Sequence, residues 1–173
     1  MLSDNISNFP EIKNYLRLSD IRQYDMNRLI FIMKGFRMPT ISRSQNPESN
    51  PRVKAVFDDI RLTRGNNFIN NLWYYLAFDA DLLEKIWNDV KTVMAKPSLL
   101  DPMTKELIYA AVSIANSCEY CIHSHTAAAR ANGMTDEQYA EFLSIVSLAG
   151  RTNHLVNAIK VPVDTQFDHE SKI

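Results

Sequence analysis

Apolar side chains recur at every third or fourth position over much of the chain, and this spacing is the strongest constraint on the fold. Such a stripe lies on one face of an α-helix, and a proline just beyond it is typical of a helix end. Only four glycines occur among 173 residues, which argues against a turn-rich β fold. We therefore predict an all-α protein. The clearest stripe, which Pro97 follows, consists of Leu82, Leu83, Ile86, Trp87, Val90, Val93 and Met94.

Two further helices are predicted upstream of this stripe. The first begins at Arg52 and ends near Gly65, within the sequence RGNN. The second covers residues 68–76 and is rich in aromatic side chains. Core packing is the expected role of these apolar residues. They are Val53, Val56, Phe57 and Ile60 in the first helix, and Phe68, Ile69, Leu72, Trp73 and Leu76 in the second.

Capping residues predict three helices downstream. Asp101 before Pro102 suits the N-cap and first position of a helix. A helix through the two cysteines is expected to reach Asn132, with Gly133 as a left-handed cap. Thr135 and Gln138 form a predicted capping box for the last helix. Leu107, Ile108, Ala111, Val112 and Ala115 are predicted to form the buried face of the first of these helices, and Tyr139, Phe142, Leu143, Val146 and Ala149 the stripe of the last.

The length of 173 residues fits a single helical domain with appendages. Residues 1–50 are predicted to be an N-terminal extension, with helical signals from Pro10 to Phe36 and then a polar, proline-punctuated loop. Residues 51–160 form the predicted helical domain, and residues 161–173 form a C-terminal tail.

Charge and hydropathy exclude several classes of protein. The 19 basic and 20 acidic residues give a net charge of −1, without the positive excess of a nucleic-acid binder. Apolar runs fall short of the roughly 18–20 residues that span a bilayer, so no membrane partner is expected. The first residues lack the order of a secretory signal, so a cytoplasmic location is expected. In a reducing compartment, a C-x-x-C pair points to metal or thiol chemistry.

Both cysteines lie in the segment NSCEYCIHSH. At about 100° per residue, Cys121 falls about 60° and His125 about 20° from Cys118, so the three share one helix face. The two Cα atoms would lie about 5 Å apart, within the range that a disulfide accepts. A helix N-terminus favours a nearby thiolate, and His125 could exchange the thiol proton.

Two other interpretations of the pair stay open. A structural zinc ion would need two more ligands, which only His123, His125, His154 and His169 could supply. His123 points about 140° away from Cys118, which makes a second ligand from this helix difficult. Alternatively, the thiols are inert and buried. His123, His154 and His169 are expected at the surface, and no metal or cofactor is expected.

The spacing of Glu106, Cys118, Cys121 and His125 resembles the E-x11-C-x-x-C-x3-H signature of the alkylhydroperoxidase D-like family, within the carboxymuconolactone decarboxylase superfamily. The likeness covers about residues 52–160 and is specific. It implies a helical bundle of the alkylhydroperoxidase D-like type that assembles into homo-trimers or homo-hexamers. The stretch with the clearest likeness is KELIYAAVSIANSCEYCIHSHTAAARANGMTDEQ.

The resemblance also implies a function, a thiol-dependent peroxidase for small hydroperoxides. By it, Cys121 would attack the peroxide, Cys118 would resolve the product, and Glu106 with His125 would relay protons. An external dithiol, lipoyl-bearing in the best-known members, would restore the thiols. Those members carry a histidine where this chain has Tyr120, which could donate a hydrogen bond but is a poor base at neutral pH.

Other functions are compatible with the same residues. The pair could serve general thiol-disulfide exchange or redox sensing. Glu106 and His125 could serve lactone chemistry of the carboxymuconolactone decarboxylase type, although the intact C-x-x-C argues against this branch. A non-enzymatic role as a redox-sensing or scaffold oligomer is the third hypothesis.

Overall fold

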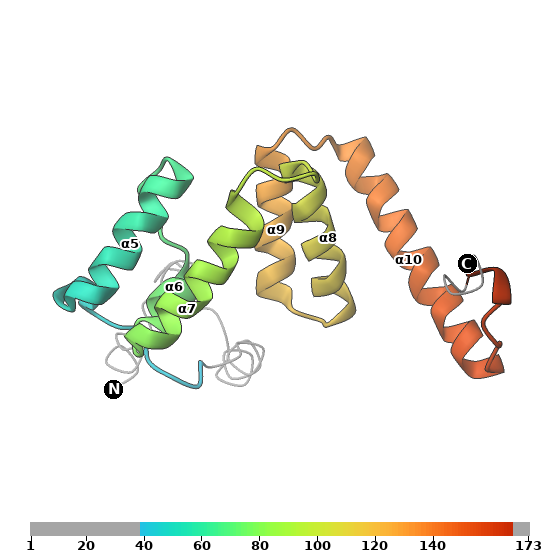
Figure 1. Cartoon of the computed structure of the whole chain (residues 1–173), viewed down its shortest axis with the longest axis horizontal. Coiled ribbons are helices and arrows are strands. Elements are labelled where there is room, and N and C mark those ends of the chain that lie inside the picture. Colours follow the sequence, from blue (N-terminus) through green and yellow to red (C-terminus); the bar gives the residue numbers. More distant parts are fainter. Residues whose placement is uncertain (1–38, 168–173) are drawn as a thin grey trace, which may run out of the picture. The chain divides into compact units, whose positions relative to one another are not determined.

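The structure is a computed structural model that describes residues 39–167. The chain divides into two compact units, Met1–Gln45 and Asn46–Ile173. In the first unit, the helix expected between Pro10 and Phe36 lies outside the described residues, and residues 39–45 form no regular element. Residues 39–167 contain six α-helices and no strand, which confirms the all-α prediction (Figure 1).

Helix α5 (Pro51–Arg64) begins one residue before the predicted start at Arg52 and ends before Gly65, as predicted. The Asn50 side chain accepts a hydrogen bond from the backbone N–H of Arg52, and Pro51 occupies the first turn. Gly65 ends the helix with φ 66°, a left-handed conformation that glycine adopts without a steric penalty.

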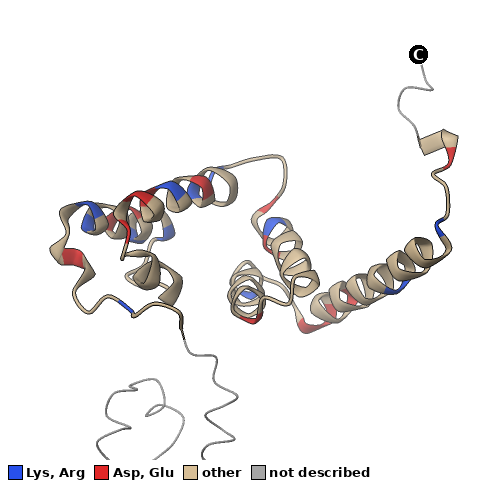
Figure 2. Ribbon diagram, turned by 90° about the horizontal axis from the view of Figure 1, so that it is seen from below, with Lys and Arg blue, Asp and Glu red and all other residues tan. Residues whose placement is uncertain are grey.

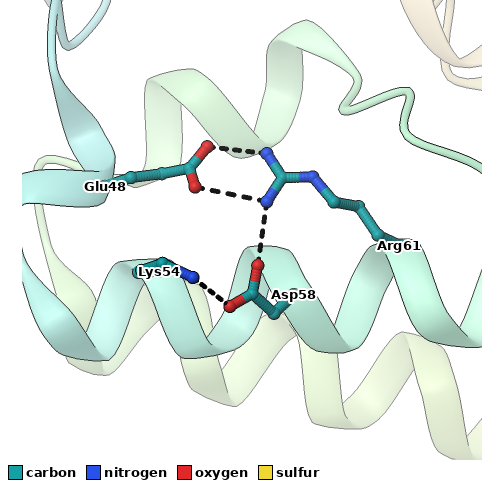
Figure 3. A network of polar contacts seen from close by, with 4 residues as sticks. All are labelled: Glu48, Lys54, Asp58 and Arg61. Carbon is teal, nitrogen blue, oxygen red and sulfur yellow. Dashed lines mark hydrogen bonds and ion pairs between the residues drawn. The ribbon is translucent and has the colours of Figure 1, made fainter.

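A short 3-10 helix, η1 (Pro47–Ser49), is tied to α5 by charged side chains. The Arg61 guanidinium binds both carboxylate oxygens of Glu48, at 2.6 and 3.2 Å, and one oxygen of Asp58, at 3.0 Å (Figure 3). Lys54 pairs with the other Asp58 oxygen. The hydrogen bonds from Arg61 hold the pKa of the Glu48 carboxyl below its usual value.

Helix α6 (Asn71–Leu76) is shorter than the sequence predicts. Phe68 and Ile69 precede it in an irregular turn, where the Phe68 backbone N–H donates to the Asn66 side chain. Ile69 is still buried. The prediction that Ile69 is a core residue is therefore confirmed, whereas the prediction that it lies in a helix is wrong.

Helix α7 (Ala80–Val90) follows, capped by Asp79, whose carboxylate accepts two backbone N–H groups of the first turn. The predicted stripe continues past α7 into η2 (Lys91–Ala95), a π-helical segment. η2 ends two residues before Pro97, as the proline predicts.

The hydrophobic core is formed by α5, α6 and α7. Edge-to-face aromatic pairs join the helices: Phe57 with Tyr74 at 5.3 Å between ring centroids, and Trp73 with Trp87 at 5.5 Å. Full burial of one such side chain stabilises the fold by about 1.5–3 kcal/mol. The core cluster is Val53, Val56, Phe57, Ile60, Ile69, Trp73, Leu83 and Trp87.

Charged groups join the same three helices at the edge of this core. The Arg64 guanidinium lies 5.7 Å from the ring centroids of both Trp73 and Trp87, a cation–π arrangement, and its pKa is lowered by burial. Asp59 on α5 accepts hydrogen bonds from the Trp87 indole, at 2.6 Å, and from the Lys91 ammonium, at 2.7 and 2.8 Å.

Helices α8 (Pro102–Ala115) and α9 (Glu119–Ala131) pack side by side as an αα-hairpin (Figure 1). Asp101 caps α8 as predicted, accepting from the backbone N–H of Thr104 at 2.9 Å. Ser117, with φ 55°, turns the chain between the helices, and Gly133, with φ 94°, follows α9.

The predicted buried face of α8 is wrong. Ile108 and Val112 are 51% and 54% exposed, whereas Ala110 and Ser113 are the buried residues of this helix. Small side chains lie buried because α9 packs closely against α8. The larger side chains line a cavity instead.

Helix α10 (Asp136–Ile159) begins with the predicted capping box of Thr135 and Gln138. None of its residues is fully buried, so the side chains of the predicted apolar stripe are at most partly buried within residues 39–167. A 3-10 turn, η3 (Thr165–Phe167), follows. None of the helices within residues 39–167 combines the length and apolarity that a membrane crossing requires.

Candidate active site

Cys118 and Cys121 form a disulfide at the start of α9. Cys118 is the N-cap residue and Cys121 lies in the first turn. Their Cα atoms are 5.3 Å apart, close to the separation that the i, i+3 spacing predicts. The cysteine pair lies at a helix start because the chain is interrupted between α8 and α9, as predicted. The chain turns at Ser117, and α9 begins directly after the first cysteine.

Glu106 and His125 meet across the hairpin. The Nδ1 atom of His125 lies 2.6 Å from an Oε atom of Glu106, and both side chains are largely buried. His125 follows Cys121 by one helical turn, as the sequence predicts. The carboxylate fixes one nitrogen of the imidazole, which leaves Nε2 for proton exchange.

Tyr109 is a site residue that the sequence analysis missed. Its ring stacks on the imidazole of His125, with 3.6 Å between the centroids and 20° between the planes. Tyr109 follows Glu106 by three residues on α8, so both side chains reach the same imidazole from one helix face. That spacing is the signal that could have identified it.

An apolar cavity of about 550 Å³ opens beside the disulfide. Both cysteines and Tyr109 line it, whereas Glu106 and His125 do not. Tyr109 therefore both lines the cavity and stacks on His125. The apolar lining is supplied by Val93, Met94, Leu100, Ile108, Tyr109 and Val112.

Tyr120, between the two cysteines, contacts a different part of the chain. Its Oη atom accepts a hydrogen bond from the backbone N–H of Leu72, at 3.2 Å. Leu72 lies in the first turn of α6, where backbone N–H groups lack helical partners. The hydroxyl therefore satisfies a helix N-terminus and retains its own proton for donation.

The remaining histidines of the described chain lie away from this arrangement. His123 is exposed, as expected, and His154 on α10 is exposed with its Nδ1 atom 2.6 Å from the carbonyl of Gly150. His169 lies outside the described residues. Within residues 39–167, no group of three or more His, Cys, Asp or Glu side chains could hold a metal ion.

Comparisons with known proteins agree with these features. Residues 81–164 match the model of the carboxymuconolactone decarboxylase family. The crystal structure of the alkylhydroperoxidase AhpD core from Rhodospirillum rubrum is 56% identical in sequence, with a TM-score of 0.73, and the match covers 76% of this chain and 98% of that one. No curated protein gives a match. The chain belongs to the alkylhydroperoxidase D-like family of the carboxymuconolactone decarboxylase superfamily.

Proposed function

We propose that the protein is a thiol-dependent peroxidase that reduces hydroperoxides with Cys118 and Cys121. The observation that carries the proposal is the disulfide in the first turn of α9, which forms part of the wall of an apolar cavity. The Glu106–His125 pair, one turn further along, supports it. The name of the Rhodospirillum rubrum relative, an alkylhydroperoxidase, agrees.

The cycle balances with two thiols and one peroxide. The Cys121 thiolate attacks the terminal oxygen of ROOH, the O–O bond breaks, and the products are a sulfenic acid and an alkoxide that takes up a proton. The Cys118 thiolate then attacks the sulfenic sulfur, and the oxygen leaves as water. An external dithiol reduces the resulting disulfide by exchange and is itself oxidised. Peroxide thus leaves as alcohol and water.

Glu106, His125 and the N-terminus of α9 would control the proton transfers of this cycle. The α9 N-terminus favours a thiolate at its first turn, because unpaired N–H groups and the helix dipole stabilise negative charge there. His125, oriented by Glu106 through Nδ1, exchanges protons through Nε2, with water as carrier. Tyr109 keeps the imidazole in place by stacking.

Tyr120 favours general thiol-disulfide exchange as a second candidate function. Its oxygen accepts the Leu72 N–H, and a phenol is a weak base at neutral pH. A relay with Tyr120 in this position has one base fewer than a relay with histidine there. Slow turnover of peroxide, together with fast exchange between the Cys118–Cys121 pair and a disulfide substrate, would favour this alternative.

The donor, the assembly and the location complete the proposal. A dithiol donor in a reducing compartment such as the cytoplasm suits the cycle, because the donor must regenerate both protein thiols. A homo-oligomer is proposed because many apolar side chains of α10 are exposed and none is fully buried within residues 39–167.

Peroxide consumption tests the function. With dihydrolipoamide as donor, we expect steady turnover of cumene hydroperoxide by the wild type. The variant Cys121→Ser should be slower by at least about a hundredfold, since the attacking sulfur is gone.

Cys118→Ser is the matched control. Without dihydrolipoamide it should still consume about one equivalent of peroxide per chain and accumulate a sulfenic acid, because only the resolving step is lost. Equal steady-state rates in the wild type and Cys121→Ser would overturn the proposal, and a sulfenic acid at Cys118 would reverse the two roles.

A further inference from the structure

The cavity beside the disulfide follows one face of α8 over almost its full length. The α8 residues that line it are spaced three or four apart, so they form one continuous stripe. The stripe begins at a positive charge and ends beside the two sulfurs. It consists of Lys105, Ile108, Tyr109, Val112, Ser113 and Asn116.

Length and polarity along this stripe are those of an extended amphiphile. From Lys105 to Asn116 the helix rises about 16 Å, at about 1.5 Å per residue. The middle of the stripe is apolar, and further apolar lining comes from Val93 and Met94 of η2 and from Leu100 before α8. Ile108 and Val112 remain half exposed, so the cavity is open to entry along its side.

Lys105 is held in a fixed place at the far end. Its ammonium donates to the carbonyls of Val93, at 2.8 Å, and of Lys96, at 3.0 Å. An ammonium has three N–H donors, so one remains for a ligand. The two carbonyls fix the Lys105 ammonium beside η2, and Lys105 is among the residues that line the cavity.

We infer that Lys105 anchors the anionic end of the substrate, and that the preferred substrate is an alkyl hydroperoxide bearing a carboxylate. The apolar body would lie along Ile108 and Val112, and the peroxide would reach Cys121. Each C–C bond of about 1.5 Å advances an extended chain by about 1.3 Å, so about twelve carbons separate the two ends. This inference rests on the proposed peroxidase function and adds the anchor, the orientation and the substrate class.

Steady-state kinetics with two substrates of different charge tests the anchor. Linoleic acid hydroperoxide and its methyl ester share the chain and the peroxide and differ in the carboxylate. We expect Lys105→Met to raise KM for the acid about five- to tenfold, with kcat nearly unchanged, because a charge-assisted hydrogen bond is lost. KM for the ester should stay within twofold of the wild type.

The comparison separates an anchor from a structural role. Lys105 also joins two backbone carbonyls, so a merely structural loss would affect acid and ester equally, and that result would overturn the inference. Lys85→Met, an exposed position of α7 that does not line the cavity, is the control for net charge. It should leave both KM values unchanged.

A binding measurement keeps the inference testable if no peroxide is consumed. Titration calorimetry on the full oxidised chain would compare laurate with lauryl alcohol, below their micelle concentrations. We expect laurate to bind about tenfold tighter than the alcohol, and Lys105→Met to remove the difference. Equal affinities in the wild type would overturn the anchor, whether or not the chain proves to be a peroxidase.

A second outcome would overturn it in another way. If neither compound binds at any protein concentration, the cavity does not hold an amphiphile, and the inference fails. Failure of peroxide turnover with a retained preference for laurate would instead count against the proposed function alone.

Discussion

At the scale of single residues, the stack of Tyr109 on His125 is the contact that joins the cavity lining to the Glu106–His125 pair. The imidazole is held on one edge by the Glu106 carboxylate and on one face by the phenol ring. Tyr109 also lines the cavity that holds the sulfurs. A ring in this place fixes the orientation of the imidazole relative to any bound peroxide, which is a positioning role.

Replacement of this ring should lower kcat more than it changes KM. An aromatic pair contributes about 0.5–1.5 kcal/mol beyond its burial, so we expect Tyr109→Leu to reduce kcat about two- to tenfold for cumene hydroperoxide. Tyr109→Phe keeps the stack and should restore the wild-type rate. A Leu variant as fast as the wild type would show that the stack has no kinetic role.

The candidate site could be predicted from the sequence as far as local spacing carries it. Cys118, Cys121 and His125 share a helix face by periodicity alone, and they do lie on one helix. The meeting of Glu106 with His125 rested on the family resemblance, because contacts between helices depend on packing. Tyr109 was missed because an aromatic at helical spacing is most often a core residue.

At the scale of elements, α5 and α7 are held together by the apolar core and by the carboxylate of Asp59 at the edge of that core. Asp59 accepts from both Lys91 and Trp87, and these hydrogen bonds lower the pKa of its carboxyl, the bond from Lys91 most. A carboxyl with a depressed pKa in the folded state stabilises the fold above its unfolded pKa of about 3.9. That stabilisation is lost as the pH falls through the folded value.

Asp59→Asn should therefore lower stability in a pH-dependent way. At pH 7 we expect a loss of about 1 kcal/mol in the free energy of unfolding by urea. As the pH falls below the unfolded pKa and through the lowered folded pKa, the variant and the wild type should converge, because the wild-type carboxyl becomes protonated as well. Asp89→Asn, an exposed carboxylate on α7, is the matched control. A difference that stays constant from pH 7 to 3 would contradict this account.

Helix boundaries could be predicted better than helix faces. Caps act within one turn, so Asp101 and Thr135 mark helix starts, and Gly65 a helix end, that the structure contains. The face that a helix buries depends on its neighbours, which is why Ile108 and Val112 of the expected α8 face line a cavity. Helix α6 was overestimated because Phe68 and Ile69 continue an apolar spacing outside the helix.

At the scale of the whole molecule, α10 stands out for the apolar surface that it exposes. Ile145, Leu148, Leu155, Val156 and Ile159 are exposed and fall on one helix face at about 100° per residue. Charges on α10 gather in its first turns, and Arg151 alone is charged among residues 142–159 (Figure 2). Exposed apolar faces of this kind mark interaction sites.

Self-association through α10 is the expected use of this face. Light scattering after size-exclusion chromatography should give the wild type a mass several times that of one chain. The double variant Leu148→Glu/Leu155→Glu should shift the mass toward a single chain, because two charges would be desolvated in the interface. Asn157→Glu, on the opposite side of α10, should leave the mass unchanged. A wild type of single-chain mass would exclude this role.

The separation of core and chemistry along the chain has an evolutionary consequence. The core cluster belongs to α5, α6, α7 and the turn before α6, whereas Glu106, Tyr109, Cys118, Cys121 and His125 belong to the α8–α9 hairpin and the turn that joins its helices. Mutations in the core cluster alter the stability of the fold, whereas mutations of the hairpin residues alter the chemistry of the site. Natural selection can thus retune reactivity while leaving durability almost untouched.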